Sequence, residues 1–449
     1  MNAARLIWRG DFHPRQRTVW GTSADTLPFK TYVPLGFSPW EGDRLTPTYP
    51  IGLPVQIALA AKALGWTHAP GFTIGAQAIL CLILVYLLCA ELGLGADWSL
   101  LGAVILGSGA LFVSLSLQVM SDVPATLWSA VSVLGVLKSR RARGWAALAG
   151  YAFMVGVTIR LSNAVMIVPL LVLLEPDVKR FMAFGVGILP PLLGLFGFNL
   201  LMYGDLMATG YPSMSAFFGP ANVLPSLVSM ARWLPVELTP LALLALAFPF
   251  VSRSWLSTRV RLGLMAWLGV YLAFYSVYQF TSENWTYQRF LMPAYPAIIA
   301  MALLVARESC TRLRLTNPRV VAPVACLVLG WNAYWWHDLR ALKSGSYNRN
   351  YSEACAFVKE HLPGGSVILC MQASGAFLYY NTNPIVRWDS VDARTFSTIK
   401  QRCRATNCPV YLVAFPFELG DVAKRFPDIR WRKVTTVQDV TVWSEAGGA

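Results

Sequence analysis

Long apolar runs separated by short polar loops occupy the chain as far as about residue 340. A helix that spans a membrane needs about 17–25 predominantly apolar residues, and about ten runs approach that length. They cover residues 71–92, 98–117, 122–138, 145–160, 162–175, 180–203, 233–252, 260–280, 290–306 and 318–336. Residues 51–66 are apolar on one face only, which predicts a helix lying on the membrane surface. The pattern predicts an all-α polytopic membrane domain.

The hydrophobic pattern changes after about residue 340. Charged residues return, and short β-rich runs at 366–371, 409–415 and 437–443 alternate with helical stretches at 351–361 and 389–402. This alternation is typical of a small α/β domain. The predicted organisation is therefore a first loop with an interfacial helix (residues 1–70), a multi-span domain (71–340) and a small α/β domain (341–449).

The composition agrees with a membrane protein. Hydrophobic residues make up 55% of the chain and charged residues 13%, whereas soluble domains carry about 25% charged residues. The net charge of +14 comes from Lys and Arg that stand between apolar runs, which argues against nucleic acid as a partner. No Cys-x-x-Cys motif occurs and the four His are far apart, so the sequence predicts no metal site built from them.

The basic residues divide the loops into two alternating sets. Four loops carry clusters of them: Lys138, Arg140, Arg141 and Arg143; Lys179 and Arg180; Arg253, Arg259 and Arg261; Arg307, Arg312, Arg314 and Arg319. Positive loops stay in the cytoplasm. The loops at 118–122, 204–232 and 281–289, the first 70 residues and the C-terminal domain are therefore predicted to be extracytoplasmic, in a bacterial inner (plasma) membrane.

Three ionisable residues stand at the predicted outer ends of spans, where such groups are functional candidates by default. Asp122 opens the run 122–138, Arg160 closes 145–160, and Arg289 precedes 290–306. One carboxylate and two guanidiniums at headgroup depth suit a phosphate attached to a lipid. A helix N-cap is the alternative explanation for Asp122, and a snorkelling side chain is the alternative for Arg160.

Several motifs resemble those of the C-type (GT-C) membrane glycosyltransferases, the relatives of the protein O-mannosyltransferases and the lipid A aminoarabinose transferases. The motifs are PTYPIGLP at 47–54, SDVPAT at 121–126, TIR at 158–160, FNLLMYGD at 198–205, TGY at 209–211 and RFLMP at 289–293. They follow the order of that family over about residues 1–300.

The resemblance implies transfer of a sugar from a polyprenyl-phosphate-linked donor to a lipid, glycan or protein acceptor on the outer face of the membrane. It assigns Asp122 to catalysis, and Arg289 and less firmly Arg160 to the lipid phosphate. It also implies weaker substrate contacts by Tyr49, Tyr203 and Tyr211. The general base of the family would fall just before Met1, so the resemblance implies a truncated N-terminus. It names no cofactor and leaves the need for a divalent metal open.

Two other classes of protein remain as alternatives. A secondary transporter or flippase-like protein would carry charged groups near mid-membrane within broken helices. Pro190 and Pro191 break one run, but the predicted spans are nearly free of charge at mid-depth. A non-catalytic membrane subunit, or an inactive truncated glycosyltransferase, would explain the missing carboxylate. The sequence favours the enzyme.

Overall fold

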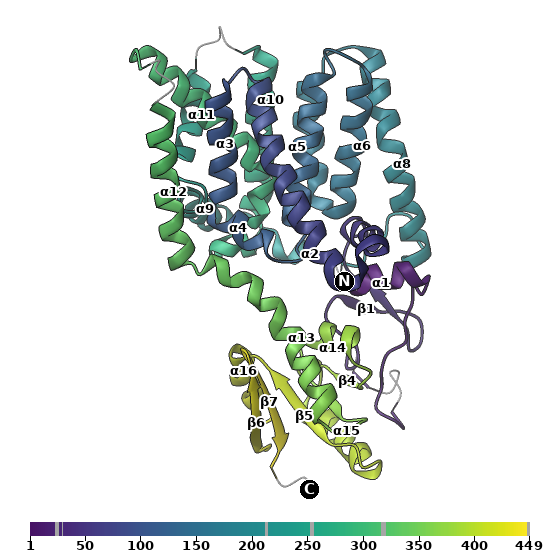
Figure 1. Cartoon of the computed structure of the whole chain (residues 1–449). Coiled ribbons are helices and arrows are strands. Elements are labelled where there is room, and N and C mark those ends of the chain that lie inside the picture. The colour runs from purple at the N-terminus through teal and green to yellow at the C-terminus, as the bar shows by residue number, and fades with distance from the viewer. Residues whose placement is uncertain (23–26, 29, 212–213, 252–255, 316–319, 447–449) are drawn as a thin grey trace. The chain divides into compact units, whose positions relative to one another are not determined.

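The computed structural model describes residues 1–22, 27–28, 30–211, 214–251, 256–315 and 320–446, so Arg253 and Arg319 lie outside the described residues. The chain forms two compact units, each built from distant parts of the sequence (Figure 1). The helical unit comprises Pro50–Gly197 and Ser213–Ser344. The mixed unit comprises Met1–Tyr49, Phe198–Pro212 and Gly345–Ala449.

The helical unit consists of helices and short 3₁₀ segments. Its helices are α2 (Gly52–Glu91), α3 (Ala96–Ser108), α4 (Ala110–Ser116), α5 (Asp122–Lys138), α6 (Gly144–Ile159), α7 (Ile167–Leu173), most of α8 (Val178–Tyr203), α9 (Val223–Glu237), α10 (Thr258–Ser276), α11 (Tyr295–Arg312) and α12 (Val321–Asp338). The 3₁₀ segments η2 (Leu161–Met166), η5 (Pro240–Phe250) and η7 (Trp285–Ala294) connect them.

The predicted apolar runs are helical, but fewer of them than expected are long enough to cross a membrane. Among the described residues, three helices pass by length and apolarity: α2, α8 and the segment Trp285–Arg312. Two bent pairs, α3–α4 (64°) and Pro220–Glu237 with η5 (115°), raise that number to five. The expectation of about ten full spans is corrected accordingly. Helix α5, with 17 residues, is about 26 Å long, shorter than a hydrocarbon core of about 30 Å.

The predicted surface helix and the first predicted span belong to one element, α2. Its backbone breaks at Gly65, where φ is 71° and ψ is 167°, a conformation that residues with a Cβ rarely adopt. The break falls between the two segments that the sequence separates, 51–66 and 71–92. The placement of the first part at the membrane surface stays a prediction.

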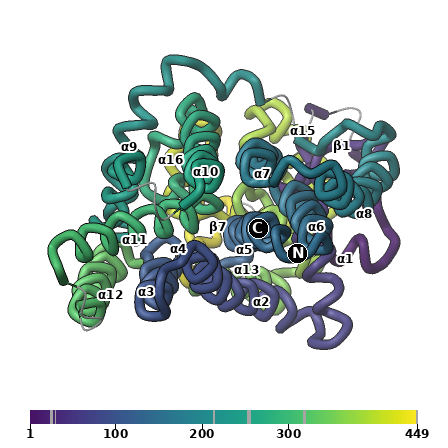
Figure 2. The backbone as a smooth tube through the Cα atoms, turned by 90° about the horizontal axis from the view of Figure 1, so that it is seen from above, coloured from purple at the N-terminus to yellow at the C-terminus, as the bar shows by residue number. Residues whose placement is uncertain are grey.

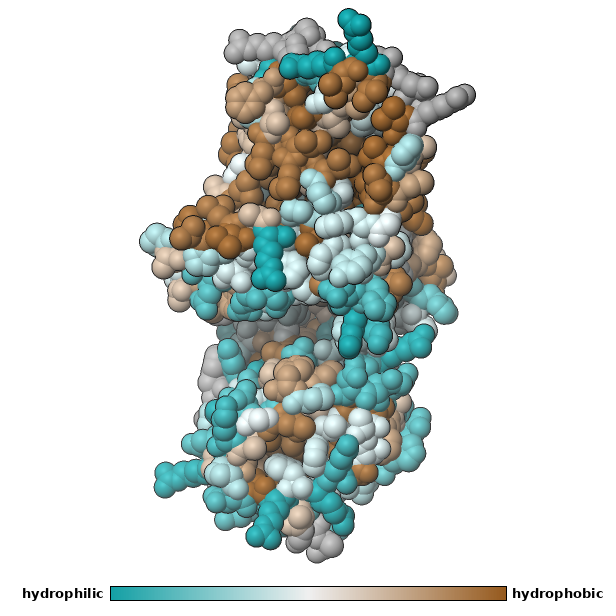
Figure 3. Space-filling view, turned by 90° about the vertical axis from the view of Figure 1, so that its left-hand side faces the viewer, coloured by the Kyte–Doolittle hydropathy of each residue, from teal (hydrophilic) through white to brown (hydrophobic). Residues whose placement is uncertain are grey.

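Helix α11 is among the most enclosed elements of the helical unit, and α8 is among the most exposed. Every residue from Tyr295 to Val305 is buried. In contrast, α8 exposes Met182 (65%) and Leu193 (65%), and apolar side chains cover much of one face of the helical unit in Figure 3. Apolar surface of this extent is what a lipid environment favours. The helical unit is therefore an integral membrane domain.

Three of the loops that the sequence predicts to be cytoplasmic contact one another. The first of them also contacts Glu91 at the end of α2, and the fourth predicted loop contacts Gly93, two residues further on. The contacts are Arg140–Glu175 (3.3 Å), Arg259–Leu174 O (2.5 Å), Arg141–Glu91 (2.9 Å) and Arg307–Gly93 O. Asp122 and Arg160 lie at the opposite ends of α5 and α6 from these loops. The basic loops thus lie at one end of the helical unit and the charged candidates at the other, as the sequence predicts. Which end faces the cytoplasm stays a prediction.

The mixed unit contains the predicted α/β fold. Its elements are α1 (Asn2–Arg9), β1 (Phe37–Pro39), β2 (Leu45–Pro47), α13 (Ser344–His361), β3 (Val367–Leu369), α14 (Ser374–Tyr380), β4 (Ile385–Val386), α15 (Ala393–Ala405), β5 (Val410–Ala414), η11 (Pro416–Glu418), α16 (Leu419–Arg425), β6 (Trp431–Val437) and β7 (Val440–Glu445). The sheet order is β4-β3-β5-β7-β6, with β4, β3 and β5 parallel and the last two pairings antiparallel.

Alternating apolar residues on the strands build two cores, one on each face of this sheet. Leu369 of β3 packs with Phe396 of α15 on one face, and Ile368 packs with Phe377 of α14 on the other. Side chains alternate between the faces of a strand, so a buried run such as Val367–Leu369 serves both cores. The predicted small α/β domain is confirmed.

The N-terminal segment, of which residues 1–22, 27–28 and 30–35 are described, also packs on this sheet through residues such as Val19 and Tyr32. Residues 17 and 31 accept hydrogen bonds from the edge strand and the residue after it: Ile385 N donates to Arg17 O (3.4 Å), and Arg387 N to Thr31 O (2.8 Å). The Arg17 guanidinium caps the end of α14 by donating to Phe377 O (3.2 Å) and Leu378 O (2.9 Å). The N-terminal segment therefore belongs to the same compact unit as the C-terminal domain. The predicted boundaries after residues 70 and 340 stay predictions.

Candidate functional site

Asp122 and Arg160 form an ion pair inside the helical unit. Asp122 is the first residue of α5, and Arg160 follows the last residue of α6. Helices α5 and α6 pack side by side (Figure 2), which brings Arg160 Nη1 to 2.6 Å from Asp122 Oδ1. The Asp122 side chain is 2% exposed, and Ser121 occupies the N-cap position. The carboxylate thus serves an ion pair rather than a helix cap.

Arg289 joins this pair through its backbone and a shared aromatic ring. Arg160 Nη1 also lies 3.4 Å from Arg289 O. The guanidinium carbons of Arg160 and Arg289 lie 5.0 and 5.4 Å from the centre of the Phe290 ring, within the range of cation–π attraction. The three predicted charged residues therefore meet, although Arg289 lies 129 residues after Arg160 in the sequence.

Aromatic rings surround the two guanidiniums. Tyr275 stacks on Phe290 with ring centres 5.1 Å apart, and Tyr278 and Tyr287 contact the same ring at 5.3 and 5.9 Å. Tyr287 also lies 5.6 Å from the Arg289 guanidinium. These rings lower the local dielectric constant, and the guanidiniums therefore interact more strongly with nearby charges.

A second layer of hydrogen bonds fixes the backbone around Arg160. Tyr271 donates to Asn163 Oδ1 (2.9 Å), and Asn163 Nδ2 in turn lies 3.3 Å from Ser129 Oγ. Tyr275 donates to Ser162 Oγ (2.6 Å). These bonds tie η2 to α5 and α10, so the turn that carries Arg160 is held before any substrate arrives.

The charges of this cluster favour an anion. It contains one carboxylate and two guanidiniums, and Arg289 has no ion pair with a carboxylate among the described residues. Guanidiniums bind phosphate in a bidentate geometry. A divalent cation prefers several carboxylate or carbonyl oxygens, and two positive neighbours oppose it. The cluster fits a phosphate better than a metal ion.

The three predicted tyrosines meet in the mixed unit, around the end of the β1–β2 hairpin. Tyr203 donates to Pro47 O (2.8 Å), and the Tyr49 and Tyr211 rings lie edge to face with centres 6.2 Å apart. A Cβ on Gly210 would lie 2.6 Å from Thr48 Cα, so only glycine permits this approach. Tyr49 remains 58% exposed. The contacts bring the tyrosines together, and their role in binding substrate stays a prediction.

Sequence reasoning missed one buried acidic residue, Glu237. It lies in the predicted span 233–252, at the end of α9, and is fully buried. Its Oε2 accepts a hydrogen bond from Tyr295 (2.5 Å). Glu237 is thus an ionisable group inside a predicted span that the sequence analysis did not name as a candidate. The signal was present in the sequence as one acidic residue in a long apolar run.

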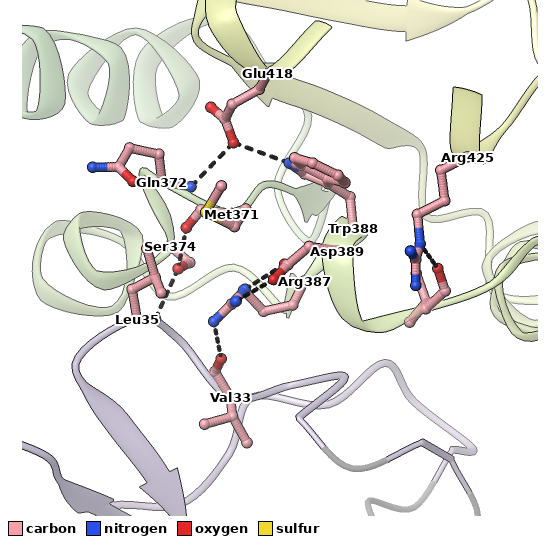
Figure 4. Close-up of polar contacts among 11 residues, drawn as sticks. Val33, Leu35, Met371, Gln372, Ser374, Arg387, Trp388, Asp389, Glu418 and Arg425 are labelled. Atoms are coloured by element: carbon pink, nitrogen blue, oxygen red, sulfur yellow. Dashed lines mark hydrogen bonds and ion pairs between the residues drawn. The ribbon is translucent and has the colours of Figure 1, made fainter. Parts of the chain in front are cut away.

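A second polar cluster lies in the mixed unit, where the parallel strands end (Figure 4). In sheets of this kind ligands bind outside the carboxyl ends of the strands. Here Glu418, which is 1% exposed, occupies that edge. Its oxygens accept hydrogen bonds from Phe415 N (2.8 Å), Trp388 Nε1 (3.0 Å) and Gln372 N (3.2 Å). The protein's own carboxylate takes the donors that an anionic ligand would need.

The N-terminal segment covers the rest of this edge. Leu35 N donates to Ser374 Oγ (2.9 Å), and Arg387 Nη1 donates to Val33 O (3.2 Å) while the same guanidinium pairs with Asp389. The edge is therefore a contact for the chain's own loop, and the Asp122 cluster is the better candidate site.

No protein-family model and no curated protein matches the sequence. Solved structures nevertheless share its fold. ArnT from Cupriavidus metallidurans in the apo state matches with a TM-score of 0.57 at 13% identity, over 99% of this chain and 96% of its own. The same protein bound to undecaprenyl phosphate gives 0.56 at 12% identity, over 89% and 88%. The arabinofuranosyltransferase AftD from Mycobacteria gives 0.52 at 12% identity, over 99% of this chain but only 39% of AftD. ArnT and AftD are both GT-C proteins, so the predicted GT-C fold is confirmed.

Proposed function

We propose that this chain, which has the GT-C fold, is a membrane glycosyltransferase. It takes a sugar from a polyprenyl-phosphate-linked donor and transfers it to a lipid, glycan or protein acceptor on the outer face of the membrane. The likeness to ArnT bound to undecaprenyl phosphate supports the class of donor. A shared fold does not by itself give a function, so the argument rests on the charged cluster of this chain.

The observation that carries the proposal is the meeting of Asp122, Arg160 and Arg289. A donor of this class presents one phosphate at headgroup depth beside a reacting sugar carbon. Arg160 is already ion-paired with Asp122, which partly neutralises its charge, whereas Arg289 has no carboxylate partner among the described residues. We therefore assign the phosphate first to Arg289 and second to Arg160.

The assigned roles account for every bond in the transfer. The acceptor oxygen bonds to the anomeric carbon while the bond from that carbon to the phosphate oxygen breaks. The electron pair of the broken bond goes to the phosphate, where the Arg289 guanidinium stabilises the developing charge. The acceptor hydroxyl gives its proton to a carboxylate, and we place Asp122 on that side of the donor.

A secondary transporter or flippase-like protein is the second candidate, and Glu237 is the observation that favours it. Transporters carry buried polar groups where helices are interrupted. Glu237 lies where the chain bends by 115° between α9 and η5. A flippase moves its lipid across the membrane intact, whereas a transferase breaks the sugar–phosphate bond.

Reconstitution of the purified protein into liposomes distinguishes a transferase from a transporter and from a non-catalytic subunit. Purified protein in liposomes receives polyprenyl-phosphate sugars that carry label in the sugar, together with lipid, glycan and peptide acceptors. We expect release of free polyprenyl phosphate with label in one acceptor fraction, and loss of both with Arg289→Ala. Movement of intact donor between leaflets without release of phosphate would support the transporter instead. Binding of polyprenyl phosphate with neither outcome would indicate a non-catalytic subunit.

A further inference from the structure

Two cysteines of the mixed unit lie at the C-terminal end of helix α15. Cys403 belongs to the last turn of the helix and is 2% exposed. Cys408 lies between α15 and β5 and packs against the core that contains Cys403. Both are thiols in this structure. The proposed reaction uses neither of them.

The turn that ends α15 brings the two cysteines together. Cys408 N donates to Cys403 O (2.8 Å), and Asn407 N donates to Arg404 O (3.3 Å). Asn407 has a φ of 53°, in the left-handed region. These two bonds, closed by a left-handed residue, define the Schellman motif, in which the side chains at the positions of Cys403 and Cys408 commonly contact each other.

The hydrogen bond between the two residues limits the distance that a disulfide has to span. With standard backbone bond lengths, a separation of 2.8 Å between Cys408 N and Cys403 O places the two Cα atoms at most about 6.7 Å apart. Disulfides join Cα atoms that are about 4.4–6.8 Å apart. Cys408 Sγ also lies 3.5 Å from Thr406 O, so the sulfur lies against the end of α15.

We propose that Cys403 and Cys408 form a disulfide bond that closes the turn between α15 and β5. The two thiols give two protons and two electrons to the disulfide of a donor, either a thiol–disulfide oxidoreductase or glutathione disulfide. The donor reaches Cys408 first, because Cys403 is buried. The Cys408 sulfur displaces one donor sulfur, the Cys403 sulfur then displaces the other, and both donor sulfurs leave as thiols.

The bond closes a ring around a turn that the backbone already forms, so the helix and the strand keep their places. Such bonds form and persist outside the cytoplasm, which is where the sequence predicts this domain to lie. The proposal is independent of the proposed function, because no step of sugar transfer involves these thiols.

Oxidation of the purified full-length protein tests the proposal. After incubation with glutathione disulfide, the remaining thiols are alkylated during denaturation without reduction, and the protein is digested with trypsin. Trypsin cleaves after Arg404, which stands between the two cysteines, so a disulfide joins two separate peptides. We expect this linked pair of peptides at high occupancy, and its loss in Cys408→Ser.

Cys81 and Cys89 are the matched control within the same sample. Both are buried, and they lie eight residues apart on α2, about 12 Å along its axis, which is too far for a disulfide. They should carry the alkylating group. Absence of the linked peptides, with Cys408 either alkylated or joined only to glutathione, would show that the two thiols are merely packed together and would overturn the proposal.

Thermal unfolding measures what the bond does for the fold. Dithiothreitol should lower the melting temperature of the oxidised wild type by a few degrees, because the reduced unfolded chain regains conformational freedom. The reductant should leave the melting temperature of Cys408→Ser unchanged. An equal effect of the reductant on both proteins would mean that the bond does not hold the turn.

Discussion

The Asp122–Arg160 pair decides how substitutions at the site can be interpreted. Both side chains are largely buried, at 2% and 14% exposure. Breaking such a pair from one side leaves an uncompensated charge and costs about 3–5 kcal/mol. A loss of activity at either residue must therefore be separated from a loss of folded protein.

For Asp122→Asn we expect nearly complete loss of transfer, because the amide lacks the negative charge that Asp122 places on the acceptor side of the donor. We also expect a lower melting temperature, since Arg160 loses its partner. The double variant Asp122→Asn/Arg160→Met removes both charges and should regain stability without regaining activity. Near-normal transfer per folded molecule in Asp122→Asn would remove Asp122 from the mechanism.

Arg289 offers the cleaner test, because among the described residues it has no carboxylate partner to leave behind. A donor placed on a developing charge contributes about 3–4 kcal/mol, so Arg289→Ala should slow transfer about a hundredfold or more. Arg289→Lys should restore only part of the rate, because lysine lacks the bidentate fork. Arg404→Ala, at an exposed position of α15, is the control. Equal rates for the two alanine variants would exclude a phosphate contact at Arg289.

At the scale of elements, the helices that carry the site are held together by very close backbone contacts. A Cβ on Gly150 of α6 would lie 2.0 Å from Phe184 O of α8, and one on Gly187 of α8 would lie 1.9 Å from Ala147 O. Small residues at helix contacts are the usual means of close packing within membranes. These glycines let α8 lie directly against the helix that ends at Arg160.

Gly150→Ala should therefore force α6 and α8 apart and destabilise the protein by about 1–3 kcal/mol. Gly144→Ala, on the same helix, meets nothing within 4 Å and should be neutral or slightly stabilising, because alanine favours a helix over glycine. Thermal unfolding in detergent measures both. A Gly150→Ala protein as stable as wild type would show that the two helices do not pack this closely.

At the scale of the whole molecule, the mixed unit joins the two ends of the chain. Arg387 is 8% exposed, pairs with Asp389 through both of its oxygens and donates to Val33 O in the N-terminal segment. Its side chain thus connects the sheet edge with the loop that leads to the tyrosines of the β1–β2 hairpin.

Arg387→Ala should destabilise the mixed unit by about 3 kcal/mol, since Asp389 loses its buried partner. Limited proteolysis should then cut the N-terminal segment in the intact membrane protein much faster than in wild type. The exposed Arg394 on α15 provides the control Arg394→Ala. Unchanged cleavage in Arg387→Ala would mean that the segment is held by other contacts.

The orientation of the molecule is a further prediction at this scale. The four basic loops gather at one end of the helical unit, and positive loops stay in the cytoplasm. A reporter that is active only in the cytoplasm should be silent when it is fused after Ala449. A strong signal would place the Asp122 cluster on the cytoplasmic side and rule out an outer-face acceptor.

The sequence by itself determined the local features of this protein. Apolar runs predicted the helices, short β-rich runs predicted β3, β5 and β7, and motif order predicted the GT-C fold. These features depend on neighbouring residues and their periodicity, which a single sequence contains. Strands β4 and β6 were missed, β4 because it has only two residues. The lengths of the spans were misjudged because bends at Gly109 and beyond Glu237 follow from packing.

Only the tertiary structure decided which distant groups meet. It paired Asp122 with Arg160, joined Glu237 to Tyr295, and placed Arg17 and Thr31 on the edge of a sheet formed more than 300 residues later. Such contacts depend on the packing of whole helices and strands against one another, and no local pattern records them. The sequence named charged residues that could act, and the fold selected the partners with which they act.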